Sequence, residues 1–390
     1  MHNSSSGKSE KFAIRGVDGR ARTGVFTTFH GDFPTPAFMP VGTQGTVKGV
    51  TPRDLKELGA QIILSNTYHL HIRPGDELIR DLGGLHRFCG WDGPILTDSG
   101  GYQVFSLPTL RKVEESGVTF RSHLDGAELR FTPERVVQIQ ENLGVDIMMM
   151  LDECLPYPAT ESATADSLAM TNRWGARAIA ARRNPRCALF GIVQGGMYPH
   201  LRQRAVEELC ALPFDGFALG GLSVGEPPEL LHEMVEFSAP LLPPEKIHYL
   251  MGVGTPSDIV RAVGNGIDLF DCVIPTRSAR FGRVFTRDGH INIKNAQFRK
   301  NPNPIEIGCE CYTCQHFSLA YLSHLIHAKE VLAIHLATFH NLFFYQRLMR
   351  EIREAIAEQR FSAYANEVLR REANSGAVAD VDPRSVDPLS

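Results

Sequence analysis

The feature that most constrains the fold is a regular alternation of short apolar segments with amphipathic ones. Eight apolar segments have the length and composition of buried strands, and the segments between them have the periodicity of helices. Several helix candidates, such as 51–60, 132–144 and 255–266, begin with Thr-Pro, a capping residue followed by a residue suited to the first helical turn. The strand candidates are 37–43, 61–67, 93–99, 145–153, 188–196, 215–221, 246–254 and 267–276.

These βα units predict a protein of the α/β class, folded as an eight-stranded parallel β/α (TIM) barrel. The alternative, an open doubly wound sheet, is disfavoured because no Gly-rich dinucleotide-binding turn follows a strand. We expect a single barrel domain over residues 12–372, a flexible N-terminus over 1–11 and a disordered tail over 373–390. Residues 12–43 read as short extended pieces broken by Gly and Pro.

Composition excludes several classes of protein. The chain has 390 residues, of which 43% are hydrophobic and 22% charged, as in ordinary globular proteins. Its net charge of −4 predicts no bulk affinity for nucleic acid, although a local basic patch could bind one. We see neither a signal peptide nor an apolar run of about 18 residues, so we expect a cytoplasmic protein without a membrane span.

A cysteine cluster near the C-terminus predicts a metal site. The segment "GCECYTCQH" places Cys309, Cys311 and Cys314 within one turn, which suits tetrahedral zinc in a reducing compartment. A closed Cys₃His site would be structural, pinning an insertion that follows the eighth strand. The alternative is three incidental loop cysteines. The candidates for the fourth ligand are His316, His324, His327, His335 and His340, and spacing alone does not choose among them.

Polar residues recur where the predicted strands end. In a β/α barrel the functional side chains lie at these carboxyl ends, and here they include Asp98, Asp152, Gln194 and Asp271. Asp271 lies in "LFDCVIPTR", directly after an apolar strand. Because a carboxylate removed from water is costly unless it is used or satisfied, we expect a functional role for Asp271.

A basic segment follows Asp271. Residues 276–300 contain seven Lys or Arg residues and one acidic residue, Asp288. The segment starts at the mouth of the predicted barrel, which favours phosphate binding over the alternative of a solvated surface. The basic residues are Arg277, Arg280, Arg283, Arg287, Lys294, Arg299 and Lys300.

Taken together, the motifs resemble those of bacterial tRNA-guanine transglycosylases, of the queuine tRNA-ribosyltransferase family. The resemblance runs from about Phe12 to about Arg371 and rests on "TDSGGYQVFSL", "LDEC", "VQGG", "GGLSVGE", "YLMGVG", "FDCVIPTR" and "CECYTC", in this order. It implies a β/α barrel with a zinc-binding insertion at about 277–345. It selects His340, in "LATFHN", as the fourth zinc ligand, with His335 as the competing choice.

The resemblance implies base exchange on tRNA. Guanine at the anticodon wobble position is replaced by 7-aminomethyl-7-deazaguanine in queuosine biosynthesis, through a covalent ribosyl-aspartate intermediate. Two successive inversions would retain the configuration of the ribose carbon. The resemblance assigns Asp271 as the nucleophile and Asp98 as the general acid/base. From the local sequence alone, Asp98 is equally well a turn-capping aspartate before Ser99 and Gly100.

The resemblance also implies how the base is recognised. Asp152 and Gln194 match residues that hydrogen-bond the edge of guanine. Gly221 and Leu222 match positions whose backbone contacts the base, and the paired glycines before Leu222 would allow close approach.

Other implied residues shape the pocket. Tyr102 and Met251 match residues that sandwich the base ring, although core packing would explain Met251 alone. Cys154 and Val224 match the residues found at these positions in bacterial members. Val224 would exclude the bulkier base queuine, which eukaryotic members accept with a smaller residue there.

The implied partners are the tRNA anticodon loop, whose phosphates Arg277 and Arg280 would hold, and the small 7-deazaguanine base. The implied cofactor is one structural Zn²⁺ per subunit. A homodimer is implied near the zinc insertion, where Phe317 and Tyr321 occur. Packing under the zinc loop explains these two aromatic residues equally well.

Two rival functions remain open from the sequence. A glycoside hydrolase barrel could use Asp98 and Asp271 on a sugar, but the zinc cluster and the basic segment argue against it. An inactive paralogue could bind tRNA or a partner subunit without catalysis, but the presence of both aspartates argues against that.

Overall fold

The computed structural model describes residues 11–106 and 111–374. Most of the predicted flexible N-terminus (1–11) and of the predicted disordered tail (373–390) lies outside these ranges. The first two residues of that tail form the end of helix α15 (Phe361–Asn374).

A parallel sheet closes into the predicted barrel. It contains nine strands, and the two at its ends, β4 (Ala37–Met39) and β5 (Val41–Gly42), are halves of one segment. Pro40 divides them because its nitrogen carries no hydrogen for the sheet. β4 pairs with the last barrel strand, and β5 pairs with the next barrel strand along the chain. The ring therefore has eight strand positions, and the predicted eight-stranded barrel is confirmed. The others are β6 (Ile63–Ser65), β7 (Ile95–Thr97), β11 (Ile147–Met149), β12 (Ala188–Val193), β13 (Gly216–Leu219), β14 (Ile247–Leu250) and β15 (Leu269–Asp271).

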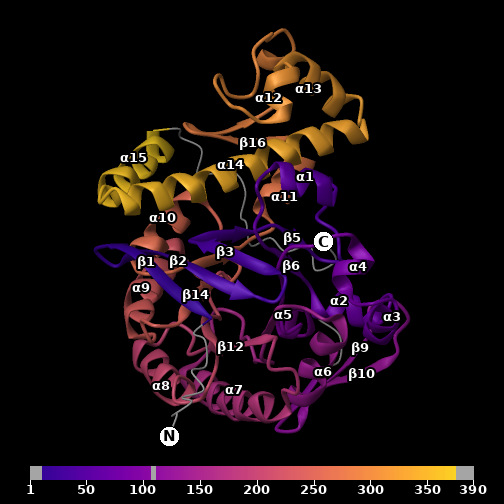
Figure 1. The fold of residues 1–390 in the computed structure, drawn as a ribbon, viewed down its shortest axis with the longest axis vertical. Helices are drawn as coiled ribbons and strands as arrows, with labels where there is room; N and C mark the ends of the chain where they lie inside the picture. The colour runs from indigo at the N-terminus through magenta and orange to yellow at the C-terminus, as the bar shows by residue number, and fades with distance from the viewer. Residues whose placement is uncertain (1–10, 107–110, 375–390) are drawn as a thin grey trace, which may run out of the picture.

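Helices surround the barrel, as Figure 1 shows. The predicted Thr-Pro starts are confirmed at three of them, because Thr51, Thr132 and Thr255 each accept a backbone N–H from the first turn of the helix that follows. The helices between β5 and β15 are α1 (Pro52–Glu57), α2 (Thr67–Ile72), α3 (Asp76–Asp81), α4 (Leu85–Cys89), α5 (Gly101–Ser106), α6 (Pro133–Leu143), α7 (Glu161–Ala181), α8 (Pro199–Leu209), α9 (Pro228–Ser238), the 3₁₀ helix η1 (Ala239–Leu241) and α10 (Pro256–Gly264).

An antiparallel N-terminal sheet lies against the amino ends of the barrel strands. It consists of β1 (Phe12–Asp18), β2 (Ala21–Thr28) and β3 (Gly31–Thr35), which follows the predicted extended pieces. Arg22 forms a buried ion pair with Asp268, which directly precedes β15. Ring nitrogens of His30 and His86 lie 2.9 and 3.1 Å from the carboxylate oxygens of Asp146, which precedes β11. The contacts of Arg22 and His30 attach the sheet to the floor of the barrel, and His86 of a neighbouring helix meets the same carboxylate.

A second antiparallel sheet interrupts one βα connection. Strands β8 (Lys112–Glu114), β9 (Gly117–Arg121) and β10 (Glu128–Phe131) lie between α5 and α6. Trp174 of α7 donates its indole N–H to the backbone oxygen of Glu115, between β8 and β9, at 2.9 Å. The sheet therefore packs on the outer ring of helices.

The C-terminal part of the chain forms a separate unit above the barrel. Figure 1 shows α14 passing between the barrel and the pair α12 and α13. None of the described helices is both long and apolar enough to cross a membrane. The elements are α11 (Ile274–Arg280), β16 (Arg283–Thr286), β17 (Gly289–Asn292), the 3₁₀ helix η2 (Ala296–Phe298), α12 (Tyr312–His316), α13 (Leu319–His327), α14 (Val331–Ala357) and α15.

Candidate active site and metal centre

A pocket opens at the carboxyl ends of the barrel strands. Its wall carries polar groups from strands that are far apart in the sequence, because parallel strands present the same ends to one face. The structure brings ten of the predicted functional residues to this wall: Asp98, Tyr102, Asp152, Cys154, Gly221, Leu222, Val224, Met251, Asp271 and Arg277.

Asp271 ends strand β15 at the floor of the pocket. Its Oδ1 accepts hydrogen bonds from the Tyr249 hydroxyl at 2.6 Å and from the Gly252 N–H at 2.8 Å. Burial raises the pKa of this carboxyl, while these two hydrogen bonds oppose the shift. The bonds fix the orientation of the carboxylate through one oxygen, and Oδ2 takes part in neither.

Asp98 follows β7 and lies on the same wall. Its Oδ1 accepts the Thr67 N–H at 2.9 Å and the Gly100 N–H at 3.2 Å, and its Oδ2 accepts from the Asn66 side chain. Burial raises the pKa of Asp98 to about 7; the charge of Asp271 adds to the shift, and the Thr67 hydrogen bond opposes it. Near neutral pH, Asp98 can therefore take up and release a proton.

Asp152 and Gln194 form a third polar group from β11 and β12. The Gln194 side-chain N–H donates to Asp152 Oδ2 at 2.7 Å, and the Ser99 hydroxyl donates to Oδ1 at 2.9 Å. Burial raises the pKa of Asp152 to about 6, against these two hydrogen bonds. Gln194 lines an adjoining pocket that shares Gly221 and Val224 with this one, and its side chain contacts Asp152 between them.

A glycine turn after β13 brings backbone to the pocket. Gly221 has φ of +64°, a conformation that favours glycine. A Cβ at this position would also lie 2.3 Å from Gln194 Oε1. Only glycine therefore allows Gly221 and Leu222 to pass this close to the amide of Gln194.

Less polar side chains complete the wall. Tyr102, in α5, is 39% exposed, and Met251 follows β14. Cys154 and Val224 are half-buried, and burial raises the pKa of the Cys154 thiol, which stays neutral. Arg277 reaches the wall from α11, whereas Arg280, one turn further along this helix, does not.

Sequence reasoning missed several residues that hold this arrangement. Tyr249 orients Asp271, Asn66 contacts Asp98, and Ser99 contacts Asp152. Glu226 is fully buried and accepts the backbone N–H groups of Ser223 and Val224. The buried glutamate in "GGLSVGE" was a usable signal, because a carboxylate among apolar and Gly residues needs partners.

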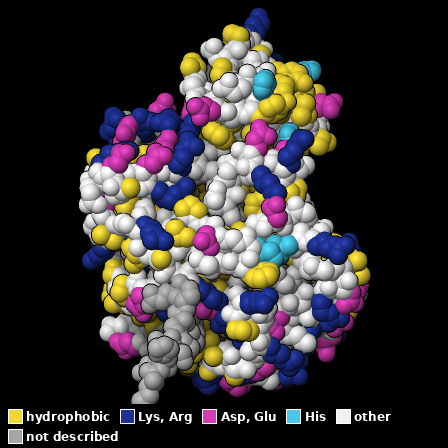
Figure 2. Space-filling model, viewed as in Figure 1, with side chains coloured by type: hydrophobic (Ala, Val, Ile, Leu, Met, Phe, Trp, Pro, Cys, Tyr) yellow, Lys and Arg dark blue, Asp and Glu magenta, His cyan; other side chains and the backbone are white. Residues whose placement is uncertain are grey.

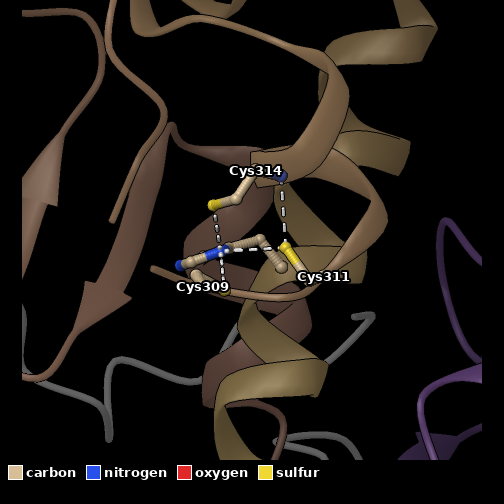
Figure 3. Close-up of side chains that lie close together, drawn as sticks. Cys309, Cys311 and Cys314 are labelled. Carbon is tan, nitrogen blue, oxygen red and sulfur yellow. Dashed lines mark hydrogen bonds between the residues drawn. The ribbon is translucent and has the colours of Figure 1, made fainter. Parts of the chain in front are cut away.

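The predicted metal ligands converge in the C-terminal unit. Figure 3 shows Cys309, Cys311 and Cys314 around one imidazole, and all three are buried. Their sulfurs lie 3.9, 3.4 and 3.3 Å from His340 Nδ1. Spacings of about 3.5 Å are those between ligand atoms of a tetrahedral ion with zinc-like bond lengths. The group could therefore hold a metal ion.

The structure also decides between the two candidate histidines. His335 lies elsewhere, with its Nδ1 2.8 Å from the Gly49 carbonyl oxygen. His340 is fully buried, and its Nε2 lies 2.7 Å from the Phe285 carbonyl oxygen. A hydrogen bond there leaves Nδ1 as the ligand atom, which is the usual support for a metal-binding histidine.

The residue after His340 links this group to α11, the helix beside the pocket. The buried Asn341 accepts the Phe285 N–H at 3.0 Å and donates to the carbonyl oxygen of Pro275 at 2.9 Å. Pro275 lies in the first turn of α11, the helix that carries Arg277. Further along α14, Tyr345 donates to the Gly254 carbonyl oxygen at 2.6 Å. One helix, α14, thus carries a residue of the metal group and also contacts α11 and the loop after β14, both of which contribute to the pocket wall.

The fold and the site define a class: β/α-barrel proteins in which carboxylates of several strands meet in one pocket and a C-terminal unit carries a buried Cys₃His group. Residues 18–374 match the family model described as "Queuine tRNA-ribosyltransferase". The chain belongs to this family. It is 54% identical over 359 residues to the queuine tRNA-ribosyltransferase of Solidesulfovibrio magneticus, covering 92% of this chain and 96% of the relative. It is 53% identical over 358 residues to that of Natranaerobius thermophilus, with 92% and 97% covered.

Proposed function

We propose that this protein is a tRNA-guanine transglycosylase, which exchanges guanine at the anticodon wobble position for 7-aminomethyl-7-deazaguanine. The observation that carries the proposal is the pair of carboxylates, Asp98 and Asp271, from non-adjacent strands in one pocket. Their environments differ: Asp271 is held by two donors through one oxygen, whereas Asp98 has a pKa near neutrality. Such a pair suits one nucleophile and one proton carrier.

The proposed reaction proceeds in two displacements at C1′ of the ribose. Asp271 Oδ2 attacks C1′ as the bond to guanine N9 breaks, and guanine takes the proton of Asp98 and leaves as a neutral base. The incoming base then returns a proton from its N9 to Asp98 as N9 attacks C1′ and the bond to Asp271 breaks. Two inversions retain the configuration, and both carboxyls regain their starting states.

The proposed base site uses the remaining polar groups. Asp152 would accept the ring N–H and the exocyclic amine, and Gln194 would donate to the carbonyl oxygen, as the mutual contact of the two side chains supports. The backbone at Gly221 and Leu222 would contact the 7-substituent side. Tyr102, exposed at the pocket wall, would cover the ring opposite Met251.

Val224 and Cys154 would limit the size of the base. Both line the pocket, and the side chain of Val224 would overlap with a substituent much larger than an aminomethyl group. We therefore propose 7-aminomethyl-7-deazaguanine rather than queuine as the incoming base.

The proposed RNA contact lies where the basic segment meets the pocket. Arg277 is on the pocket wall and Arg280 follows on the same helix, so α11 can hold phosphates of the anticodon loop while the base is turned out. The exposed Lys294, Arg299 and Lys300 extend this positive surface. Arg287 contributes less, because it is paired with Glu306 and Glu351.

We propose one Zn²⁺ per subunit, held by Cys309, Cys311, Cys314 and His340. Three thiolates and one imidazole are donors that zinc prefers, and they leave no open position for substrate. When bound, the ion would supply cross-links among α12, the preceding loop and α14, and no chemistry at the ribose. Thiolates in this number also favour the reducing cytoplasm as the place where the protein works.

We further propose a homodimer formed through the C-terminal unit. The rings of Phe317 and Tyr321 stack with centroids 5.5 Å apart, and Tyr321 is 39% exposed. A second subunit could bind the same tRNA and enlarge the positively charged surface, which is small in a chain with a net charge of −4.

The decisive test traps the covalent intermediate. With tRNA and a base analogue that halts the second displacement, the natural chain should form an RNA–protein adduct at Asp271 and, without the analogue, should incorporate labelled guanine into tRNA. Asp271→Asn should abolish both while still binding tRNA, because the amide keeps the shape of the side chain but is not a nucleophile.

Asp92→Asn is the matched control, because the Asp92 side chain is 77% exposed and pairs with Lys56, and neither residue lines the pocket. A natural chain that binds tRNA without incorporating guanine would support the rival non-catalytic paralogue. Release of free sugar from glycosides would support the rival hydrolase. Normal exchange by Asp271→Asn would contradict the proposed nucleophile.

A further inference from the structure

One buried cation close to the base site has no role in the reaction described above. Arg202 lies in the first turn of α8 and is fully buried. Its Nε donates to the carbonyl oxygen of Gly196 at 2.7 Å, and its Nη2 donates to the carbonyl oxygen of Gly220 at 3.1 Å. One guanidinium thus joins two loops, which follow strands β12 and β13.

Both carbonyls belong to loops that carry the proposed base-reading groups. Gly196 is two residues after Gln194, and Gly220 directly precedes Gly221. Gly195 lies so close to α8 that a Cβ on it would lie 2.7 Å from the Arg202 backbone nitrogen. Close approaches therefore explain three of these glycines: Gly195 lies against Arg202, and Gly220 and Gly221 lie against the amide of Gln194.

If Arg202 only filled space, burying its charge would destabilise the folded protein. No described carboxylate lies within ion-pair distance of its guanidinium, and its Nη1 has no hydrogen-bond partner among the described residues. Burial lowers the pKa of Arg202 to about 10, and the buried Glu226 opposes this shift, so the group stays charged at neutral pH. A buried cation costs several kcal/mol unless its contacts compensate.

We propose that Arg202 is a positioning residue for base recognition: it fixes the Gly196 and Gly220 carbonyls and thereby the spacing between the Gln194 amide and the Gly221–Leu222 backbone. This inference rests on the proposed function. Arg202 touches neither base nor ribose. Replacing Arg202 should therefore lower the affinity for the base and leave both the rate of the reaction at Asp271 and the affinity for tRNA unchanged.

The experiment compares Arg202→Met, which keeps the length but removes charge and donors, with Arg202→Lys, which keeps the charge and one donor. Guanine exchange into tRNA gives KM for guanine, KM for tRNA and kcat, and equilibrium dialysis with labelled guanine gives the affinity without tRNA. We expect Arg202→Met to raise both the KM for guanine and the dissociation constant of guanine by about ten- to a hundredfold. Loss of a supporting hydrogen-bond partner has an effect of this size at metal sites. Both kcat and KM for tRNA should stay within about threefold, and Arg202→Lys should fall between the two proteins.

Arg22→Met is the matched control. Arg22 is also buried and also donates to two carbonyl oxygens, of Pro244 and Lys246, but at the floor of the barrel. The Arg22→Met variant should have a lower melting temperature and an unchanged KM for guanine. The inference fails if guanine affinity is unaltered in Arg202→Met, or if all constants change together with stability. Should Arg202→Met not fold, natural guanine affinity in Arg202→Lys would also overturn it. Absence of exchange by the natural chain would instead contradict the proposed function.

Discussion

Two aspartates in one pocket differ because their surroundings differ. Asp98 accepts the Gly100 N–H, so it is the turn-capping residue that its local sequence suggests, and it also lies on the pocket wall beside Asp271. The two interpretations are therefore compatible. The low exposure and the neighbouring negative charge raise the pKa of Asp98 to about 7, which the sequence could not predict because it depends on chain segments far apart.

The first prediction concerns pH. In the mechanism proposed above, guanine release needs Asp98 protonated and Asp271 ionised. The protonated fraction of Asp98 falls as pH rises through about 7, and the ionised fraction of Asp271 falls as pH drops through its raised pKa. The kcat/KM for tRNA should therefore follow a bell, with an alkaline limb near pH 7 that falls about tenfold per pH unit.

The measurement is the initial rate of labelled guanine incorporation at low tRNA concentration between pH 5 and 9. A rate that keeps rising to pH 9, with the protein still folded, would contradict the role of Asp98 as the acid. The melting temperature at each pH serves as the control for unfolding.

The residues that sequence reasoning missed share one property. Arg202 and Glu226 occur in segments where a charged residue usually faces solvent, but here both are fully buried. Their burial depends on the close approach of glycine loops to α8. No pattern within α8 itself indicates that its first turn faces inwards, so tertiary structure was needed to find Arg202, whereas the glutamate in "GGLSVGE" could have been noticed in the sequence.

At the scale of elements, the eight strands were predictable because parallel barrel strands are buried on both faces and read as apolar runs. Helix α7 was harder to predict from the sequence, because small and polar residues such as Thr164, Ser167 and Gly175 interrupt the apolar stripe on its buried face. Strands β8 to β10 were not predicted, because they lie within a single βα connection and follow no barrel repeat.

Helix α14 belongs to both the metal group and the barrel. His340 contributes to the Cys₃His group, Asn341 holds α11 and β16, and Tyr345 holds the loop after β14. The family resemblance indicated the first of these roles, because the cysteine spacing alone does not choose among the candidate histidines. The other two depend on which carbonyls α14 meets, and the sequence does not encode that pairing in any local pattern.

The second prediction concerns metal loss. Cys314→Ser should reduce bound zinc below one ion per chain and lower the melting temperature by several degrees, because the cross-link between α12 and α14 is lost. Affinity for tRNA should fall more than affinity for guanine, because α14 supports α11 and the RNA contact proposed there.

Elemental analysis, thermal unfolding and separate binding measurements for tRNA and guanine would test this. Cys210→Ser is the control, since Cys210 is a free thiol at the end of α8, outside the metal group. Full metal content and natural stability in Cys314→Ser would contradict the proposed structural zinc site.

At the scale of the molecule, hydrophobic side chains gather on the C-terminal unit. Figure 2 shows them at the upper right, over the region that α12 and α13 occupy in Figure 1. Contiguous exposed apolar surface is unusual on a monomer and marks an interaction site. Among the described residues of this unit, the exposed large hydrophobic ones are Phe281, Ile307, Tyr312, Tyr321, Val331 and Leu332.

The third prediction concerns the proposed homodimer. Tyr321→Asp should weaken self-association by about thirtyfold, the effect of removing a central aromatic contact worth about 2 kcal/mol. Sedimentation velocity over a concentration series would measure it. Leu241→Asp changes a similarly exposed residue on the barrel side and should have no effect. A natural chain that remains monomeric at micromolar concentration would contradict the dimer.

The pairing of β4 with β15 has a consequence for when the enzyme becomes reactive. Met39 meets Asp271 in that pairing, so the nucleophilic strand finds its last neighbour near the start of the chain. Contacts between such distant segments form late in folding. A nascent chain still short of β15 has neither Asp271 nor a complete ring of barrel strands. If Asp271 is the nucleophile proposed above, chemistry at the ribose can begin only once synthesis has passed the last barrel strand.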